Sequence, residues 1–191
     1  MIKRIWKTCN IITFAGLLSA VAGIALCFNN KISLAVICLI ISGICDGFDG
    51  PFAKKINKGP TEYGAELDSL ADIISFGILP VCICLGLGFN GIGNVIIYSL
   101  FVVCGVTRLA YYNVNSKEDD CFTGIPITAS CIIIPITYIL TKSEIVYMGL
   151  LVLLSFSYVS EFNIKKPSLI EKILLSITGF LVVALVFFSN R

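Results

Sequence analysis

This 191-residue chain contains no histidine. A histidine base, a histidine nucleophile and a histidine-ligated zinc ion are therefore excluded, and any proton acceptor must be a carboxylate, a lysine, a tyrosine or a cysteine. Charged residues are also scarce, at 14% of the chain, and the net charge of +2 is too small to indicate a nucleic-acid partner. The chemistry of this chain must come from a few ionisable side chains.

Disulfide and zinc motifs are missing as well. The nine cysteines are scattered along apolar runs, with only Cys82 and Cys84 close together and no C-x-x-C pair. This pattern favours buried free thiols in a reducing compartment over a disulfide framework.

Apolar residues, by contrast, are abundant. They make up 57% of the sequence, and the mean hydropathy is +0.95, which is typical of polytopic membrane proteins. We predict an all-α transmembrane bundle in which residues 1–191 form one integral membrane domain of about seven spans, with six to eight compatible with the pattern. The predicted spans are residues 10–28, 32–56, 62–88, 93–113, 124–141, 144–160 and 169–188.

The amino terminus differs from these spans. In residues 1–9, Ile2, Ile5 and Trp6 share one helical face and three basic side chains the other, which predicts a short amphipathic helix on an anionic membrane surface. A secretory signal is the rival interpretation. A cytoplasmic turn near Gly59 puts eleven of the fourteen lysines and arginines inside. We therefore predict a multi-pass protein of the cell membrane with a cytoplasmic amino terminus and its active site in the cytoplasmic leaflet.

Four aspartates interrupt the apolar sequence between residues 46 and 72: Asp46, Asp49, Asp68 and Asp72. Members of the first pair are three residues apart and members of the second are four apart, so each pair projects from one face of a helix. Gly59-Pro60 marks a turn between the two segments. An antiparallel hairpin about this turn would bring all four carboxylates to one depth.

Clustered carboxylates in a membrane need a cation, because each aspartate at the bilayer centre costs about 2.5 to 3.5 kcal/mol. Lys54 and Lys55 cannot neutralise four carboxylates and also hold their geometry. Oxygen ligands without histidine or cysteine suit Mg²⁺, Mn²⁺ or Ca²⁺. We predict two divalent ions, the usual clamp for displacement at phosphorus; a structural charge cluster or a solvated loop is the alternative.

The spacing of these residues resembles a known signature. The pattern runs Asp46-x-x-Asp49-Gly50-x-x-Ala53-Lys54, then Gly64-x-x-x-Asp68-x-x-x-Asp72. It is similar to the motif of the CDP-alcohol phosphatidyltransferases, which usually have arginine where this chain has Lys54. The resemblance covers roughly residues 10–130, the expected catalytic core, and leaves residues 131–191 as additional transmembrane helices that supply packing or dimer surface.

The resemblance implies a role for each motif residue. Asp46, Asp49, Asp68 and Asp72 would hold the two divalent ions. The nucleotide of a CDP-activated lipid would contact Gly50, Ala53, Lys54 and Gly64. Asp72 would in addition take the proton from the attacking hydroxyl, and CMP would leave. The lipid tails could be diacyl or of the archaeol type.

Further residues resemble the branch of the family that uses serine as the acceptor, the CDP-diacylglycerol-serine O-phosphatidyltransferases. They are the run Glu66 to Asp72, Ser75-Phe76-Gly77 with Pro80, Thr107-Arg108-Leu109-Ala110 with Asn113, and Phe122 to Pro126. Arg108 lies deep in its predicted span, so it needs an anionic partner. We predict that Arg108 binds the serine carboxylate, with Asn113, Ser75 and Glu66 as polar partners. Snorkelling of Arg108 or pairing with an acidic residue is the other interpretation.

Two other functions remain open. The first is the same chemistry with another acceptor, such as glycerol phosphate, inositol phosphate or choline, although a phosphorylated acceptor would need more basic residues than Arg108. The second is a divalent cation transporter with intramembrane carboxylates, although no second copy of the acidic stretch is present.

Overall fold

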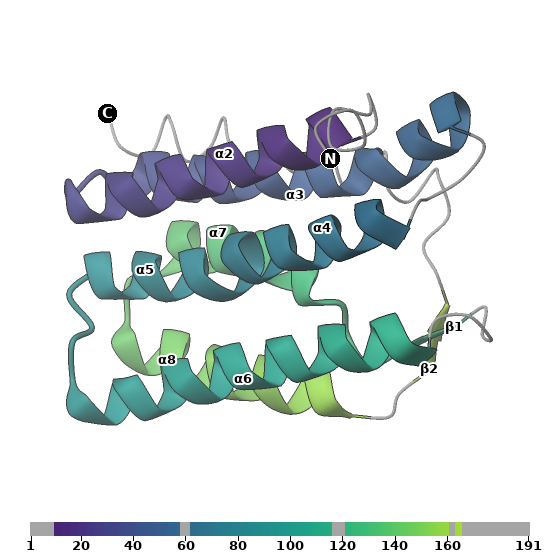
Figure 1. Ribbon diagram of the computed structural model, residues 1–191. Helices are drawn as coiled ribbons and strands as arrows, with labels where there is room; N and C mark the ends of the chain where they lie inside the picture. Colours follow the sequence, from purple (N-terminus) through teal and green to yellow (C-terminus); the bar gives the residue numbers. More distant parts are fainter. Residues whose placement is uncertain (1–9, 58–61, 116–120, 161–162, 166–191) are drawn as a thin grey trace.

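The computed structural model describes residues 10–57, 62–115, 121–160 and 163–165, and describes side chains for residues 10–48, 63–114 and 124–160. The helices are α2 (Asn10–Phe28), α3 (Ile32–Asn57), α4 (Glu62–Asp72), the π-helix η1 (Ile73–Ile78), α5 (Leu79–Gly86), α6 (Ile92–Asn115), the 3-10 turn η2 (Ile127–Ala129), α7 (Ser130–Leu140) and α8 (Glu144–Val159). They run back and forth side by side, and α4, η1 and α5 follow one another as a single rod (Figure 1).

The all-α prediction is confirmed for the described bundle, and the helices coincide closely with six of the predicted spans. Within the described part of the chain, three helices are long and apolar enough to cross a membrane: Asn10–Phe28, Tyr63–Gly86 and Ile92–Val114. The predicted interfacial helix at residues 1–9 and the predicted span at residues 169–188 lie outside the described residues. The seven-span count therefore stays a prediction.

One feature was not predicted. The strands β1 (Cys121–Thr123) and β2 (Asn163–Lys165) pair antiparallel, with Phe122 opposite Ile164. This ladder joins the segment that precedes η2 to the segment that follows α8 (Figure 1).

Helices α2 and α3 form the closest pair in the bundle because small residues line their contact. The hydroxyl of Ser42 donates a hydrogen bond to the carbonyl oxygen of Gly16 at 2.7 Å. The hydroxyl of Ser19 donates one to the carbonyl oxygen of Cys38 at 3.0 Å. Lipid is as apolar as leucine, so close packing and interhelical hydrogen bonds, rather than a hydrophobic driving force, hold such helices together.

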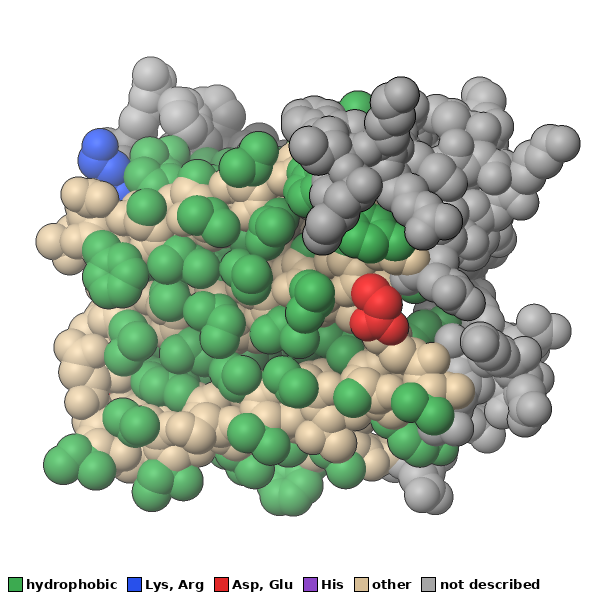
Figure 2. Space-filling view, viewed as in Figure 1, with side chains coloured by type: hydrophobic (Ala, Val, Ile, Leu, Met, Phe, Trp, Pro, Cys, Tyr) green, Lys and Arg blue, Asp and Glu red, His purple; other side chains and the backbone are tan. Residues whose placement is uncertain are grey.

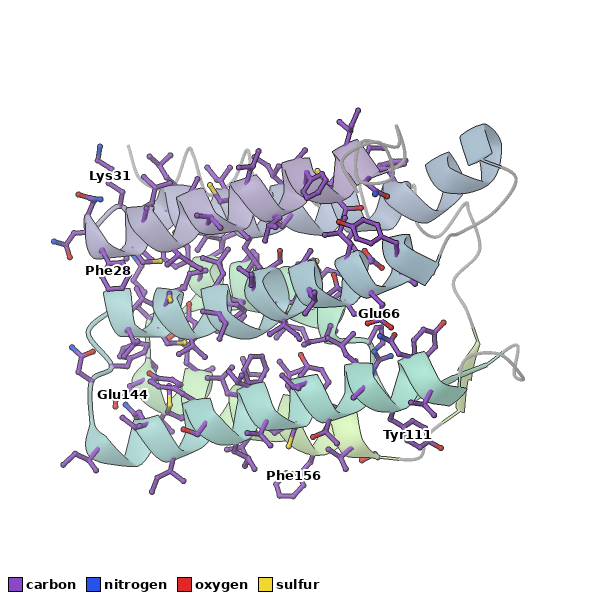
Figure 3. The ribbon with its side chains drawn as sticks, in the orientation of Figure 1. Phe28, Lys31, Glu66, Tyr111, Glu144 and Phe156 are labelled. Carbon is purple, nitrogen blue, oxygen red and sulfur yellow. The ribbon has the colours of Figure 1, made fainter. Side chains whose placement is uncertain are left out.

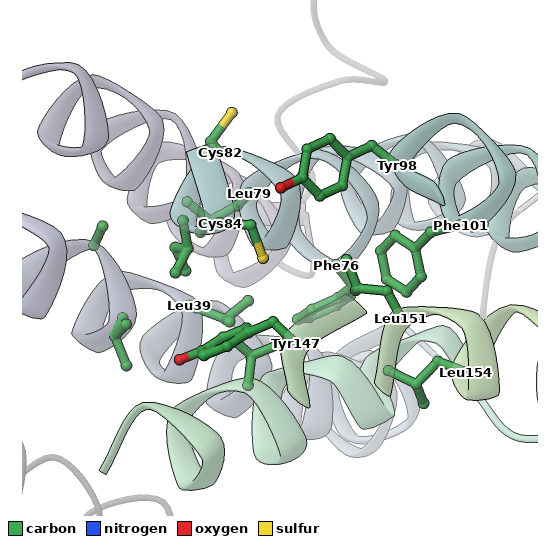
Figure 4. Close-up of a cluster of buried hydrophobic side chains, with 14 of the residues drawn as sticks. Leu39, Phe76, Leu79, Cys82, Cys84, Tyr98, Phe101, Tyr147, Leu151 and Leu154 are labelled. Carbon is green, nitrogen blue, oxygen red and sulfur yellow. The ribbon is translucent and has the colours of Figure 1, made fainter. Parts of the chain in front are cut away.

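The centre of the bundle is filled by large apolar side chains from four elements. Leu39, Phe76, Phe101, Tyr147 and Leu151 are all at most 1% exposed, and they converge between α3, η1, α6 and α8 (Figure 4). Much of the surface is apolar as well, as Figure 2 shows for one face. An apolar exterior around a packed core is what a lipid-facing bundle requires.

A substitution at Gly23 tests the close packing of α2 against α3 and α5. A Cβ atom at Gly23 would lie 3.0 Å from the Cβ of Cys38 and 3.0 Å from a methyl carbon of Leu79. Gly23→Leu should therefore separate three elements and lower the stability by about 1 to 3 kcal/mol, measured as thermal unfolding in detergent. The matched control is Gly149→Leu, because Gly149 has no neighbour within 4 Å of a Cβ among the described residues. Equal melting temperatures for the two variants would contradict the packing described here.

Candidate active site

Three aspartates meet where α3 approaches α4. Carboxylate oxygens of Asp46, Asp68 and Asp72 all lie within 4.8 Å of one another. Asp72 is 9% exposed and the other two are half-buried. The chain reversal between α3 and α4 thus brings together side chains that are more than twenty residues apart in sequence. The backbone of Asp49 lies in α3 one turn beyond Asp46, but its side chain is outside the described set.

Helix geometry explains this arrangement. Asp68 and Asp72 are four residues apart on α4 and so project from the same face. Asp72 is the last residue of α4, and the π-helix η1 begins at Ile73. A π-helix is wider than an α-helix and is often found at functional sites. The local geometry of the chain therefore changes immediately after the most buried of the three aspartates.

The aspartates line a small pocket between α2, α3, α4 and η1. Its other polar side chains are hydroxyls and one thiol: Thr13 of α2, Ser42 and Cys45 of α3, and Ser75 of η1. Ser75 is 3% exposed. Carboxylate and hydroxyl oxygens around a partly enclosed space are the donor set that Mg²⁺, Mn²⁺ or Ca²⁺ requires. The residues present therefore fit a divalent cation.

Helix α2 forms one wall of the acidic pocket, which the sequence did not predict. Thr13 lines the pocket, and Asn10 at the start of the same helix is only 3% exposed. A signal was present in the sequence, because Asn10 and Thr13 are polar, three residues apart and placed at one end of an apolar span. Polar residues at such positions in membrane helices commonly face a functional interior.

Arg108 lies beside this pocket. It is 7% exposed, and its Nε and Nη2 atoms are buried without a hydrogen-bond partner among the described residues. Its guanidinium carbon is 5.9 Å from the centre of the Tyr112 ring, and Asp72 is near enough to interact with its charge. Arg108 is thus buried rather than extended to the surface, and it has hydrogen-bond donors to spare.

The other residues predicted to contact the serine substrate do not all lie at the pocket. Asn113 pairs with Ser69, whose Oγ lies 3.0 Å from the amide nitrogen and 3.1 Å from the amide oxygen. This contact ties α6 to α4 between two of the aspartates. Glu66 is exposed, on the edge of α4 that faces α6 (Figure 3). Of these residues, Ser75 lines the acidic pocket.

The predicted nucleotide contacts are only partly described. Gly64 is half-buried on α4, one turn before Asp68. Gly50, Ala53 and Lys54 lie in the last turns of α3, beyond Asp46, and their side chains are outside the described set.

Cation binding can be tested without any assay of turnover. We expect Mn²⁺ at about 100 times its dissociation constant to stabilise the protein by about 2.7 kcal/mol, because it offsets the repulsion between the three carboxylates. Asp68→Asn should lose most of this gain. Glu66→Gln on the same helix is the control and should keep it, since Glu66 is outside the acidic cluster. The measurement is thermal unfolding in detergent with and without Mn²⁺, and an equal gain in the Asp68 variant would argue against the site.

Comparison with known proteins identifies the chemistry that this geometry serves. The family model for CDP-alcohol phosphatidyltransferase matches residues 6–161. The CDP-diacylglycerol–serine O-phosphatidyltransferase of Helicobacter pylori is 31% identical over 172 residues, covering 83% of this chain and 71% of that protein. The enzyme of the same name from Methanocaldococcus jannaschii is 30% identical over 90% of this chain and 80% of its own length. The archaetidylserine synthase of Methanothermobacter thermautotrophicus is 31% identical over 63% of this chain and 53% of that protein. This chain is therefore a transferase of phospholipid synthesis that belongs to the CDP-alcohol phosphatidyltransferase family.

Proposed function

We propose that this protein transfers a phosphatidyl group from a CDP-activated lipid to the hydroxyl of L-serine and releases CMP. The observation that carries this proposal is the placement of a buried arginine with unpaired donors, Arg108, beside an acidic pocket at Asp72. Relatives that are named for serine or archaetidylserine support the choice of acceptor. The lipid substrate is of the CDP-diacylglycerol or CDP-archaeol type.

Four aspartates would hold two divalent ions: Asp46, Asp49, Asp68 and Asp72. When bound, these ions neutralise the pyrophosphate of the CDP-lipid and stabilise the charge that develops on the departing CMP. In support, three of the four carboxylates lie within 4.8 Å of one another.

The nucleotide would lie along the ends of α3 and α4 that carry the motif. Gly50, Ala53 and Gly64 are small, so the pyrophosphate and the cytosine can approach the helix backbones closely. Lys54 would contact a phosphate oxygen as a point charge, since it lacks the bidentate geometry of arginine.

Asp72 would act as the base. The serine oxygen attacks the phosphorus that is linked to the lipid, and its proton passes to the carboxylate of Asp72. The bond between this phosphorus and the CMP oxygen breaks, and CMP keeps that oxygen. Asp72 is the most buried of the three described aspartates, and its charge interacts with that of Arg108, the residue proposed to bind the serine carboxylate.

Arg108 would bind the carboxylate of serine, because a guanidinium forms two parallel hydrogen bonds to a carboxylate. Ser75, which lines the pocket, would contact the attacking hydroxyl. Glu66 and Asn113 would receive the ammonium group; Asn113 would exchange its contact with Ser69 for one with the substrate. Among the described side chains, Arg108 is the basic residue near the pocket, which favours an amino-acid acceptor over a phosphorylated one.

We place the pocket in the cytoplasmic leaflet, with the amino terminus on the same side. The described lysines Lys31 and Lys142 lie in the turns at the end of the bundle opposite the pocket. Most of the other lysines and arginines are predicted from the sequence to lie on the same side of the membrane as the pocket, and basic residues are enriched on the cytoplasmic side of membrane proteins. A water-soluble acceptor would then enter from the cytoplasm while the lipid stays in the membrane. Residues 131–191 would supply packing or a homodimer surface.

An acceptor screen tests the proposal. We expect CMP release from CDP-diacylglycerol or CDP-archaeol in the presence of Mn²⁺ with L-serine, and little with glycerol phosphate, inositol phosphate or choline. Arg108→Ala should raise the serine concentration at half-maximal rate by about 10- to 100-fold, because a hydrogen bond to a charged group contributes about 1.5 to 3 kcal/mol.

The same variant provides its own control. Arg108→Ala should keep the stabilisation by Mn²⁺, which separates loss of the acceptor from loss of the metal site. An unchanged apparent affinity for serine would remove Arg108 from the acceptor site. Faster CMP release with a phosphorylated alcohol than with serine would show that the acceptor is that alcohol and not serine. Mn²⁺ flux in liposomes without CMP release would favour a transporter.

A further inference from the structure

The first turn of α7 contacts α3, which carries Asp46, and η1, which directly follows Asp72. Ser130 is fully buried, at 0% exposed, and its hydroxyl donates a hydrogen bond to the carbonyl oxygen of Phe76 at 3.0 Å. Phe76 lies in η1, the π-helix that starts directly after Asp72. Ser130 is 54 residues away from Phe76 in the sequence, so this contact is made only in the folded bundle.

The sequence explains why this carbonyl accepts a side-chain hydrogen bond. In an α-helix, the oxygen of Phe76 would accept from the backbone N–H four residues later, but that residue is Pro80. Proline has no N–H, and its ring clashes with the carbonyl four residues before it. The π-helix η1 ends two residues before Pro80, and the Ser130 hydroxyl supplies a donor in place of the N–H that Pro80 lacks. In lipid an unpaired carbonyl is costly, so the Ser130 hydroxyl stabilises the π-helix.

The next residue, Cys131, contacts α3, the helix that carries Asp46. A Cβ atom added at Gly43 of α3 would lie 2.9 Å from the Cβ of Cys131. Gly43 precedes Asp46 by three residues, or about one turn. Side chains of Ser130 and Cys131 therefore contact η1 just after Asp72 and α3 just before Asp46.

We propose that Ser130 and Cys131 are positioning residues for the metal ligands. Ser130 fixes the π-helix and with it the direction of Asp72, and Cys131 packed on Gly43 sets the spacing of α3 and Asp46. This inference rests on the proposed function, in which the aspartates bind divalent ions. It gives α7, which carries none of the motif aspartates, a part in setting the geometry of the acidic cluster.

The test measures Mn²⁺ binding directly, by the electron paramagnetic resonance of free Mn²⁺ during titration of the full-length protein in detergent. Loss of a group that orients a metal ligand typically weakens metal affinity 10- to 100-fold, so we expect Ser130→Ala to weaken Mn²⁺ binding at least about tenfold. The control is Ser155→Ala, because Ser155 is equally buried but bonds within its own helix, to the carbonyl oxygen of Leu151 at 2.7 Å. Ser155→Ala should leave Mn²⁺ affinity unchanged.

A rescue experiment tests the second contact and covers the case in which Ser130→Ala does not fold. Gly43→Ala should weaken Mn²⁺ binding, because its Cβ would collide with Cys131. The double variant Gly43→Ala with Cys131→Gly should restore the affinity. If the wild type binds Mn²⁺ and the variants at positions 43 and 130 bind it equally well, the positioning role is wrong while the proposed function stands. If the wild type itself does not bind Mn²⁺, the proposed function fails, and this inference fails with it.

Discussion

The structure depends on bringing several carboxylates together inside an apolar bundle. Oxygens of Asp46, Asp68 and Asp72 lie within 4.8 Å of one another, and like charges at such a separation repel strongly in a partly buried site. Such a cluster is unfavourable unless cations balance it. In the proposed function, the divalent ions held by these aspartates would supply that balance.

The rest of the bundle holds this pocket in shape. Small residues let α2 approach α3, so that Thr13 reaches the pocket from the side. The contact between Ser69 and Asn113 ties α4 to α6, the helix that carries Arg108. Polar interactions between helices are a main source of specificity in a membrane, because apolar contacts do not distinguish a neighbouring helix from lipid.

The sequence alone predicted the parts that follow from local periodicity. The helix ranges could be found from apolar run lengths, and the meeting of Asp46 with Asp68 and Asp72 could be predicted from helical spacing and from the turn that the sequence predicts at Gly59-Pro60. The direction of each side chain could not be found in this way. Thr13 looks like an ordinary polar residue near the start of a span, and only the packing of α2 in the bundle turns it toward the pocket.

Two further features depend on contacts between distant residues. The sequence predicts one apolar span over residues 62–88, but Ile73–Ile78 within it form a π-helix, and the carbonyl of Phe76 in that π-helix accepts a hydrogen bond from Ser130. The pairing of β1 with β2 joins segments about forty residues apart, and short strands of three residues have no periodicity to detect. Arg108 was expected from its depth to need an anion, and the structure adds that its donors are buried beside Asp72.

The central claim, that these aspartates form a site for divalent cations, is tested most directly by anomalous diffraction from crystals grown with Mn²⁺. The account predicts anomalous peaks within direct bonding distance of oxygens from Asp46, Asp68 and Asp72. Crystals without such a peak, in which the three carboxylates turn apart or pair with lysine or arginine side chains, would contradict it.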